Sequence, residues 1–123
     1  MIILDTNVLI RYFINDDVAI AKKVEAVLQT AEHLHIPAVV FPEIEYVLLK
    51  LYDSTRDAVG EAFSFLCSLS NVKVDLVVQQ AVVLYKKTNL DMADCIVACS
   101  GRQGDLIASL DRALVNNTNM EAY

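Results

Sequence analysis

Four acidic residues stand at places where an α/β fold can gather charged groups. Asp5 directly follows one short apolar run, and Asp111 directly follows another. Glu43 comes after Pro42 in the first turn of an expected helix, and Asp94 lies in a turn that opens another. Parallel α/β sheets bind ligands at the carboxyl ends of their strands, and helix N-termini favour anions. We therefore expect the four carboxylates to converge at one end of the sheet.

Such a cluster of carboxylates needs positive charge nearby. Two unit charges about 4 Å apart repel by roughly 4 kcal/mol at an effective dielectric constant of about 20. No Lys or Arg adjoins most of these positions. Mg²⁺ and Mn²⁺ prefer oxygen ligands, and one or two such ions can polarise a phosphate and activate water for in-line attack. The pattern therefore predicts metal-dependent chemistry on a phosphate ester.

Each acid also has a structural explanation of its own. Asp5 and Asp111 could cap the turns that follow them, and Asp91 is well placed to cap its own helix. Glu43 and Glu45 could be solvated charges on a helix surface. The metal interpretation therefore depends on the four acids acting together.

Short apolar runs alternate with amphipathic segments along the chain. The apolar runs predict strands at residues 2–4, 34–36, 72–74 and 105–110, with at most a short edge strand in the C-terminal tail. The amphipathic segments predict helices at residues 8–13, 18–31, 43–52, 55–68, 76–87 and 91–102. This order indicates an α/β fold, with a mostly parallel sheet covered on both faces. Residues 1–123 contain no recognisable linker, so we expect a single domain.

The composition excludes some classes of protein. Of the 123 residues 55% are hydrophobic, which excludes intrinsic disorder. The net charge of −6 argues against binding a polyanion by bulk charge alone, although it permits a nuclease that carries metal ions. The sequence has neither a membrane-spanning run nor a basic leader, so we expect no membrane association and a cytoplasmic protein. Three cysteines without a paired motif are expected to be free thiols, namely Cys67, Cys95 and Cys99.

Four segments carry a family resemblance. The opening ILDTNVLIR resembles the first motif of PIN-domain ribonucleases, and PEIEYVLLK resembles their second, with Glu43 in the acidic position. LDMADCIVAC resembles the third motif, with Asp94 in the acidic position, and SLD at Ser109–Asp111 resembles the fourth. The motifs come in family order and cover nearly the whole chain. Its length and acidity resemble the VapC-type toxins of toxin–antitoxin pairs.

The resemblance implies a fold, an activity and a set of partners. The fold would be a PIN-like three-layer α/β/α arrangement around a central sheet of 4–5 short strands. The activity would be RNA hydrolysis by metal-activated water, with one or two Mg²⁺ or Mn²⁺ ions. The partners would be an RNA substrate, a cognate antitoxin protein and a second copy of the chain in a homodimer.

The resemblance also implies roles for individual residues. The metal-binding and catalytic residues would be Asp5, Glu43, Asp94 and Asp111. Thr6, Asn7 and Ser109 would orient these carboxylates, while Asp91 would be an accessory acid or the helix cap. The basic residues closest in sequence to the acidic motifs are candidates for RNA contacts, and they are Arg11, Lys50, Arg102 and Arg112.

Three positions in this pattern need comment. Glu45 lies two residues after Glu43, so only one of them can face the site, and the motif favours Glu43. Tyr46 stands where many relatives carry Trp, and we expect it to serve in packing. Leu51 is expected on the apolar face of its helix with Ile44.

Other functions fit parts of the sequence. A structure-specific DNA nuclease would use the same acids, but such enzymes usually carry additional helices. A haloacid-dehalogenase phosphatase would need an Asp-x-Asp pair, whereas Asn7 follows Asp5 here. A receiver domain could use Asp75, but no Lys stands at a later strand end. A catalytically silent PIN-like interaction module remains the non-enzymatic alternative.

Overall fold

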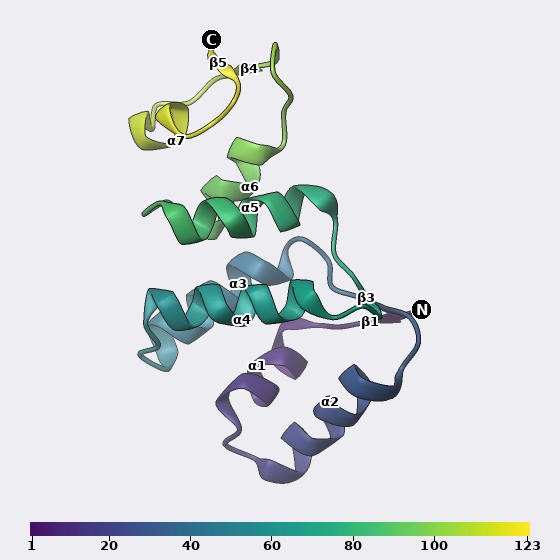
Figure 1. Cartoon of the computed structure of the whole chain (residues 1–123). Helices are drawn as coiled ribbons and strands as arrows, with labels where there is room; N and C mark the ends of the chain where they lie inside the picture. Colours follow the sequence, from purple (N-terminus) through teal and green to yellow (C-terminus); the bar gives the residue numbers. More distant parts are fainter. The chain divides into compact units, whose positions relative to one another are not determined.

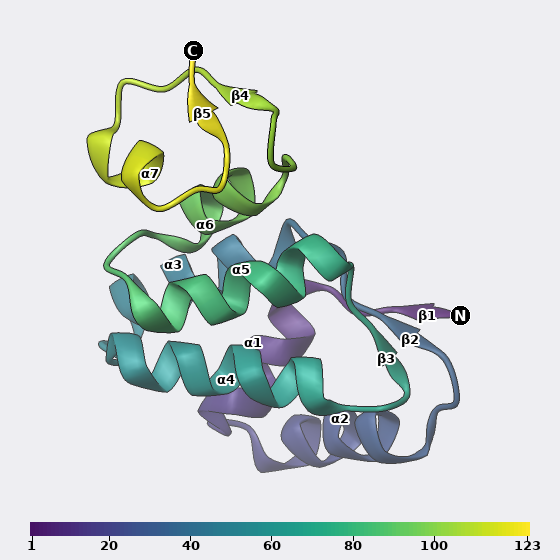
Figure 2. The same cartoon turned by 45° about the horizontal axis from the view of Figure 1, so that its top comes forward.

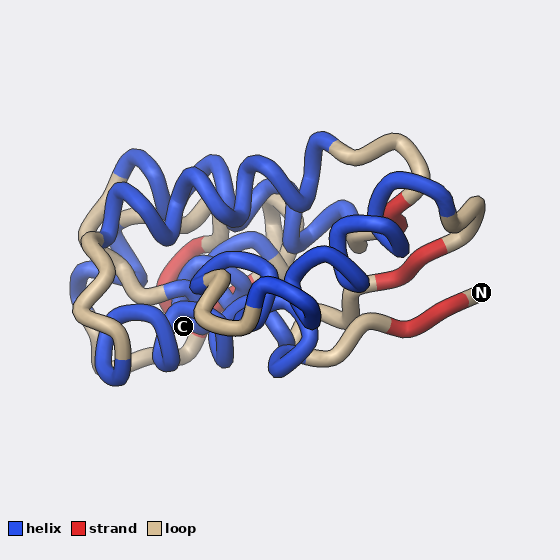
Figure 3. Tube along the Cα trace, turned by 90° about the horizontal axis from the view of Figure 1, so that it is seen from below, coloured by secondary structure: helices blue, strands red, loops and turns tan.

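Seven helices and five short strands alternate along the chain, which the computed structural model describes from residue 1 to residue 123. Helices dominate the trace (Figure 3). Each strand is two residues long. The alternation confirms the predicted α/β fold class. No helix is long and apolar enough to cross a membrane. Contacts divide the chain into two units, Met1–Asp75 and Leu76–Tyr123, and each is described by itself.

The first unit contains four helices and a three-stranded parallel sheet (Figure 1). Its elements are β1 (Ile2–Ile3), α1 (Thr6–Ile14), α2 (Val18–Thr30), β2 (Leu34–His35), α3 (Val40–Leu51), α4 (Arg56–Ser68) and β3 (Val72–Lys73). The strand order is β1-β2-β3 (Figure 2). Within this unit α1 packs against α2 and α3, and α3 packs against α4.

The register of the sheet determines where its side chains lie. Ile3 pairs with His35, and His35 pairs with Lys73. The amide of Leu4 donates to the His35 carbonyl at 2.9 Å, so pairing continues to the residue directly before Asp5. Asp5 therefore lies at the carboxyl end of β1, as predicted.

Capping side chains explain two helix starts in this unit. Asp17 accepts a hydrogen bond from the Ile20 amide at 3.2 Å and begins α2. Thr55 accepts one from the Ala58 amide at 3.1 Å and begins α4. Such caps satisfy amides that have no partner within the helix.

The second unit contains three helices and one pair of parallel strands. Its elements are α5 (Leu76–Lys87), α6 (Met92–Cys99), β4 (Leu106–Ile107), α7 (Arg112–Asn116) and β5 (Glu121–Ala122). Within this unit α6 packs against α5 and α7. The Thr118 hydroxyl donates to the Ala98 carbonyl at 2.7 Å, which ties the tail to α6.

Three details differ from the sequence prediction. Hydrogen bonds arrange the strands in one sheet of three and one of two, where one central sheet was expected. The third helix begins at Val40 instead of Glu43, because Pro42 needs no amide partner in a first turn. The fourth strand ends at Ile107, so Asp111 starts α7 and does not directly end a strand.

The three cysteines are free, as expected, with Cys95 buried and the other two half-buried. Leu51 was expected on the buried face of α3, but it is 68% exposed. It is the last residue of that helix, where no following turn covers it. Helical periodicity alone therefore predicts more burial for Leu51, the last apolar residue of the helix, than the structure shows.

Candidate nuclease site

A hydrogen bond joins the first and second acidic motifs within the first unit. The Thr6 hydroxyl donates to Oε2 of Glu43 at 2.7 Å. Thr6 is the first residue of α1 and Glu43 lies in the first turn of α3, and these helices pack together. Thr6 is only 5% exposed, so its hydroxyl is fixed by its surroundings. The predicted role of Thr6 in orienting a carboxylate agrees with this contact.

Asp5 occupies the N-cap position of α1 without acting as a cap. Its backbone is extended, and its side chain makes no capping hydrogen bond. The side chain is exposed. The alternative that Asp5 caps the next turn is therefore wrong. Asn7 is exposed on the same first turn.

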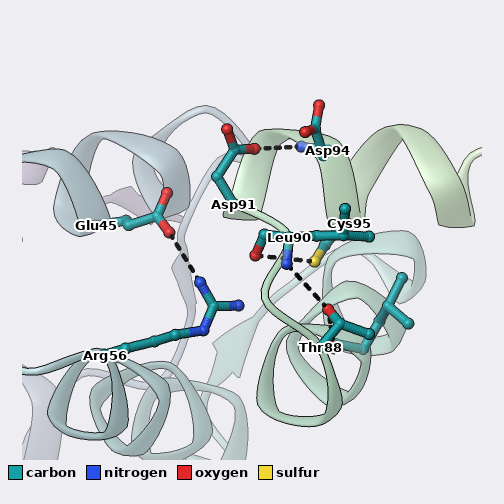
Figure 4. A network of polar contacts seen from close by, with 8 residues as sticks. Glu45, Arg56, Thr88, Leu90, Asp91, Asp94 and Cys95 are labelled. Carbon is teal, nitrogen blue, oxygen red and sulfur yellow. Dashed lines mark hydrogen bonds and ion pairs between the residues drawn. The ribbon is translucent and has the colours of Figure 1, made fainter. Parts of the chain in front are cut away.

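Glu45 has a different environment from Glu43. It is 8% exposed, and its Oε2 lies 4.0 Å from Nη1 of Arg56 at the start of α4 (Figure 4). The interpretation of Glu45 as a solvated surface charge is therefore wrong. The two glutamates point in different directions from the helix, which agrees with the expectation that only one faces the site. Arg56 was not identified from the sequence, because no local sequence pattern indicates that a residue eleven positions after Glu45 will lie beside it.

The third motif is ordered by a helix cap in the second unit. Asp91 accepts a hydrogen bond from the Asp94 amide at 2.8 Å through Oδ1 (Figure 4). The loop before it is held by the Leu90 amide, which donates to the Thr88 hydroxyl at 3.3 Å. The hydrogen bond from the Asp94 amide confirms the capping role for Asp91. Asp94 follows in the first turn of α6, where the helix dipole favours a carboxylate.

The fourth motif also forms a local network. Oδ1 of Asp111 accepts hydrogen bonds from the amides of Ala113 at 2.9 Å and Leu114 at 3.2 Å. The Asp111 amide in turn donates to the Ser109 hydroxyl at 3.0 Å. The capping alternative for Asp111 is confirmed. Oδ2 of Asp111 takes no part in these bonds, so capping leaves one oxygen for another ligand.

The four basic candidates for RNA contacts are exposed in both units. Arg11 is engaged in an ion pair with Asp16 at 2.8 Å, and that hydrogen bond raises the pKa of the Arg11 guanidinium. Lys50 lies in the last turn of α3 and takes part in no ion pair. Arg102 and Arg112 are exposed near the fourth motif.

Tyr46 does not fulfil the packing role expected of it. Its side chain is 61% exposed on the same face of α3 as Glu43. The aromatic residues that do pack in this unit are found in close pairs, such as Phe41 with Phe63 at a centroid distance of 5.3 Å. The exposure of Tyr46 could have been predicted from its spacing of three residues from Glu43, which places both on one face of the helix.

The donor chemistry of the acids suits a hard divalent cation. Neither unit by itself gathers three or more His, Cys, Asp or Glu side chains that could hold a metal ion. The candidate ligand atoms are the carboxylates of Asp5 and Asp94, and the oxygens of Glu43 and Asp111 that accept none of the hydrogen bonds described above. Carboxylate oxygens are ligands that Mg²⁺ and Mn²⁺ accept. The convergence of all four carboxylates stays a prediction.

Two surface cavities lie beside an aromatic cluster in the first unit. Their volumes are about 440 and 420 Å³, and both are lined by Tyr12 and Glu25. Tyr12 stacks on Phe65 at a centroid distance of 5.8 Å, and Phe13 meets both rings edge-on. These cavities contain none of the four candidate metal ligands.

Comparison with known proteins agrees with the four motifs. No curated protein and no solved structure matches the chain. The sequence model of the PIN domain matches residues 2–118, which includes all four acidic positions. PIN domains are generally nucleases and typically use divalent metal ions. The chain therefore belongs to the PIN domain family.

Proposed function

We propose that this protein is an Mg²⁺- or Mn²⁺-dependent endoribonuclease that hydrolyses RNA phosphodiester bonds with a water molecule. The observation that carries the proposal is the 2.7 Å hydrogen bond from Thr6 to Glu43. It positions one acidic side chain beside α1, which follows Asp5, and the carboxylate of Asp5 is left without a capping role. Carboxylates that bind metal ions are themselves held by hydrogen bonds, as Glu43 is here.

Each acid has a defined task in this proposal. Asp5, Glu43, Asp94 and Asp111 would bind one or two ions. These ions would supply positive charge that polarises the scissile phosphate and activates a water molecule. Thr6 keeps one oxygen of Glu43 occupied and so orients the other.

The charge of the protein is consistent with this mechanism. The chain carries a net charge of −6, so it has little general attraction for RNA. Affinity for a polyanion would depend on bound cations and on a few basic side chains. We therefore expect RNA binding to weaken strongly when the metal is removed.

We further propose that the enzyme is the toxin of a toxin–antitoxin pair and forms a homodimer. The family resemblance of the motifs supports the toxin role. Exposed apolar side chains in both units, such as Leu51 and Leu110, are consistent with protein partners. Co-expression with the product of a short reading frame directly upstream should yield a stable complex without RNase activity. Sedimentation of the protein alone should give a dimer at micromolar concentration.

Two alternatives are separated by one experiment. Purified protein is incubated with total cellular RNA, or with a DNA hairpin, in Mg²⁺, in Mn²⁺ or in EDTA. Discrete RNA fragments that require metal, and that disappear in Asp5→Asn and Asp94→Asn, would support the proposal. Cleavage of DNA alone would favour a structure-specific DNA nuclease. Absence of both cleavage and metal binding would favour a silent interaction module.

A further inference from the structure

One face of α3 carries three exposed side chains in line with the candidate site. They are Glu43, Tyr46 and Lys50, and we call them the outer strip of α3. Residues three and four apart share a helix face, so the spacing 43, 46, 50 aligns them. The rise per residue separates them by about 4.5 and about 6 Å along the helix axis. A ligand lying along the strip would meet a carboxylate, an aromatic ring and an ammonium group in turn.

Tyr46 is the unusual member of the outer strip. It is 61% exposed, takes part in none of the ring contacts of the first unit, and has no hydrogen-bond partner for its hydroxyl. Helical side chains lean toward the N-terminus of their helix, so its ring lies toward the turn that holds Glu43. An unengaged aromatic ring beside candidate metal-binding groups is suited to contact a substrate.

Lys50 is available in the same way. It is exposed and has no ion-pair partner, whereas Arg11 of the same unit is paired with Asp16 at 2.8 Å. The other acid of the second motif, Glu45, faces Arg56 at 4.0 Å and is buried. Lys50 therefore offers an unpaired charge on the side of α3 that carries Glu43.

We propose that the outer strip of α3 is a nucleotide-binding subsite for single-stranded RNA. The Tyr46 ring stacks on the base next to the cleaved phosphate, and Nζ of Lys50 pairs with a phosphate further along the strand. This inference rests on the proposed nuclease function, which places the scissile phosphate near Glu43. Single-stranded nucleic acids are bound by this combination of aromatic platforms and basic side chains. Stacking accepts any base, so the subsite contributes affinity with little sequence preference.

The test measures RNA affinity separately from cleavage. The parent protein is the Asp5→Asn variant in Mg²⁺, in which the Asn amide oxygen and the three remaining candidate carboxylates would still hold metal, so that RNA is bound without being cut. The probe is a fluorescein-labelled single-stranded RNA of twelve nucleotides and mixed sequence, and fluorescence anisotropy gives the Kd. The variants are Tyr46→Ala, Tyr46→Phe and Lys50→Gln. Matched controls remove an exposed tyrosine and an exposed lysine elsewhere, Tyr123→Ala and Lys23→Gln.

We expect Tyr46→Ala to weaken binding by about tenfold, while Tyr46→Phe binds like the parent because it keeps the ring. Lys50→Gln should weaken RNA binding. It should also make the plot of the logarithm of the association constant against the logarithm of the salt concentration less steep, by about 0.7. Both controls should leave the Kd unchanged. Melting curves of the Tyr46 variants should match the parent, since the side chain is exposed.

Three results would overturn the subsite. The first is that the parent protein has no measurable affinity for RNA. The second is that the Tyr46→Ala and Lys50→Gln variants bind RNA as tightly as the parent does. The third is a Tyr46→Ala variant that turns a dimer into a monomer with unchanged RNA affinity, since a second copy would then cover the strip. Failure of the nuclease proposal looks different: wild-type protein would not cleave, whereas Tyr46→Ala would still weaken RNA binding.

Discussion

The Thr6 hydroxyl and the Glu43 carboxylate are 37 residues apart in sequence and 2.7 Å apart in the structure. This bond is the direct link between the motif after β1 and the motif at the start of α3. It exists because α1 packs on α3, so that the first turns of both helices meet. Thr6 is next to Asp5 in the sequence, and its hydroxyl holds the carboxylate of Glu43 in position.

Removing the Thr6 hydroxyl should reduce activity more than stability. Thr6→Val keeps the shape of the side chain but leaves Glu43 free to rotate, so we expect metal affinity or kcat to fall about 10- to 100-fold. The free energy of unfolding should fall by only about 1 kcal/mol, a typical value for one hydrogen bond. Mg²⁺ titrations of RNA cleavage, with urea denaturation alongside, measure both quantities.

Thr6→Ser is the matched control, since it retains the hydroxyl and should retain most activity. A Thr6→Val enzyme with wild-type metal dependence would show that Glu43 needs no orientation by Thr6. An equal loss in both variants would show that the hydroxyl alone does not account for the effect.

Asp111 combines a structural and a chemical role, and two substitutions separate them. Asp111→Asn can still accept from the Ala113 and Leu114 amides, because Asn caps helices as well as Asp does. Asp111→Ala loses the cap and should cost about 1 kcal/mol of stability. We expect both variants to lose metal-dependent cleavage, and only Asp111→Ala to melt at a lower temperature. Cleavage by a stable Asp111→Asn protein would remove this residue from the proposed metal ligands.

Asp5 should behave differently from Asp111. Its carboxylate does not cap α1, so Asp5→Asn removes no capping bond. We expect the free energy of unfolding to stay within about 0.5 kcal/mol of wild type, as for surface substitutions away from such features. RNA cleavage should nevertheless be lost. A large drop in the urea midpoint of Asp5→Asn would reveal a structural role for this carboxylate.

Local patterns in the sequence predicted much of this architecture. Alternating apolar runs and amphipathic segments located the helices and strands, and its capping residue type identified Asp91 as a helix start. Such signals act over a few residues, so one sequence suffices to read them. The acidic positions were found in the same way, from strand ends and first helical turns.

Long-range contacts could not be predicted in this way. Glu45 looks like any surface glutamate until α4 brings Arg56 to it, and Tyr46 looks like a core residue until the packing of α3 leaves it exposed. The separate pairing of β4 with β5 depends on tertiary contacts that no local pattern encodes. The errors therefore concern which strands pair and which face of an element is covered.

The contact between Glu45 and Arg56 predicts an asymmetric stability effect. Glu45 is buried, so Arg56→Gln leaves its charge with less compensation, and we expect a loss on the order of 1–3 kcal/mol. Glu45→Gln removes the charge itself and should cost less. Urea denaturation of both single variants and the double variant gives the coupling energy. Additive effects would show that the 4.0 Å contact contributes nothing measurable.

Burial raises the pKa of the Cys67 and Cys99 thiols, which gives stability a defined dependence on pH. Above the ordinary thiol pKa of about 8.5, the unfolded chain releases these protons while the folded chain retains them. The unfolded state then binds fewer protons, so the free energy of unfolding should fall as the pH rises through that region. Urea denaturation between pH 7 and 10, with Cys67→Ala as the comparison, measures the slope.

The same pKa shifts predict slow thiol chemistry. The thiolate is the reactive form, so Cys67 and Cys99 of the native protein should react with Ellman's reagent more slowly at pH 8 than in urea. Cys95, which is buried, should be the slowest. A native protein in which Cys67 reacts as fast as in urea would contradict the burial that raises its pKa.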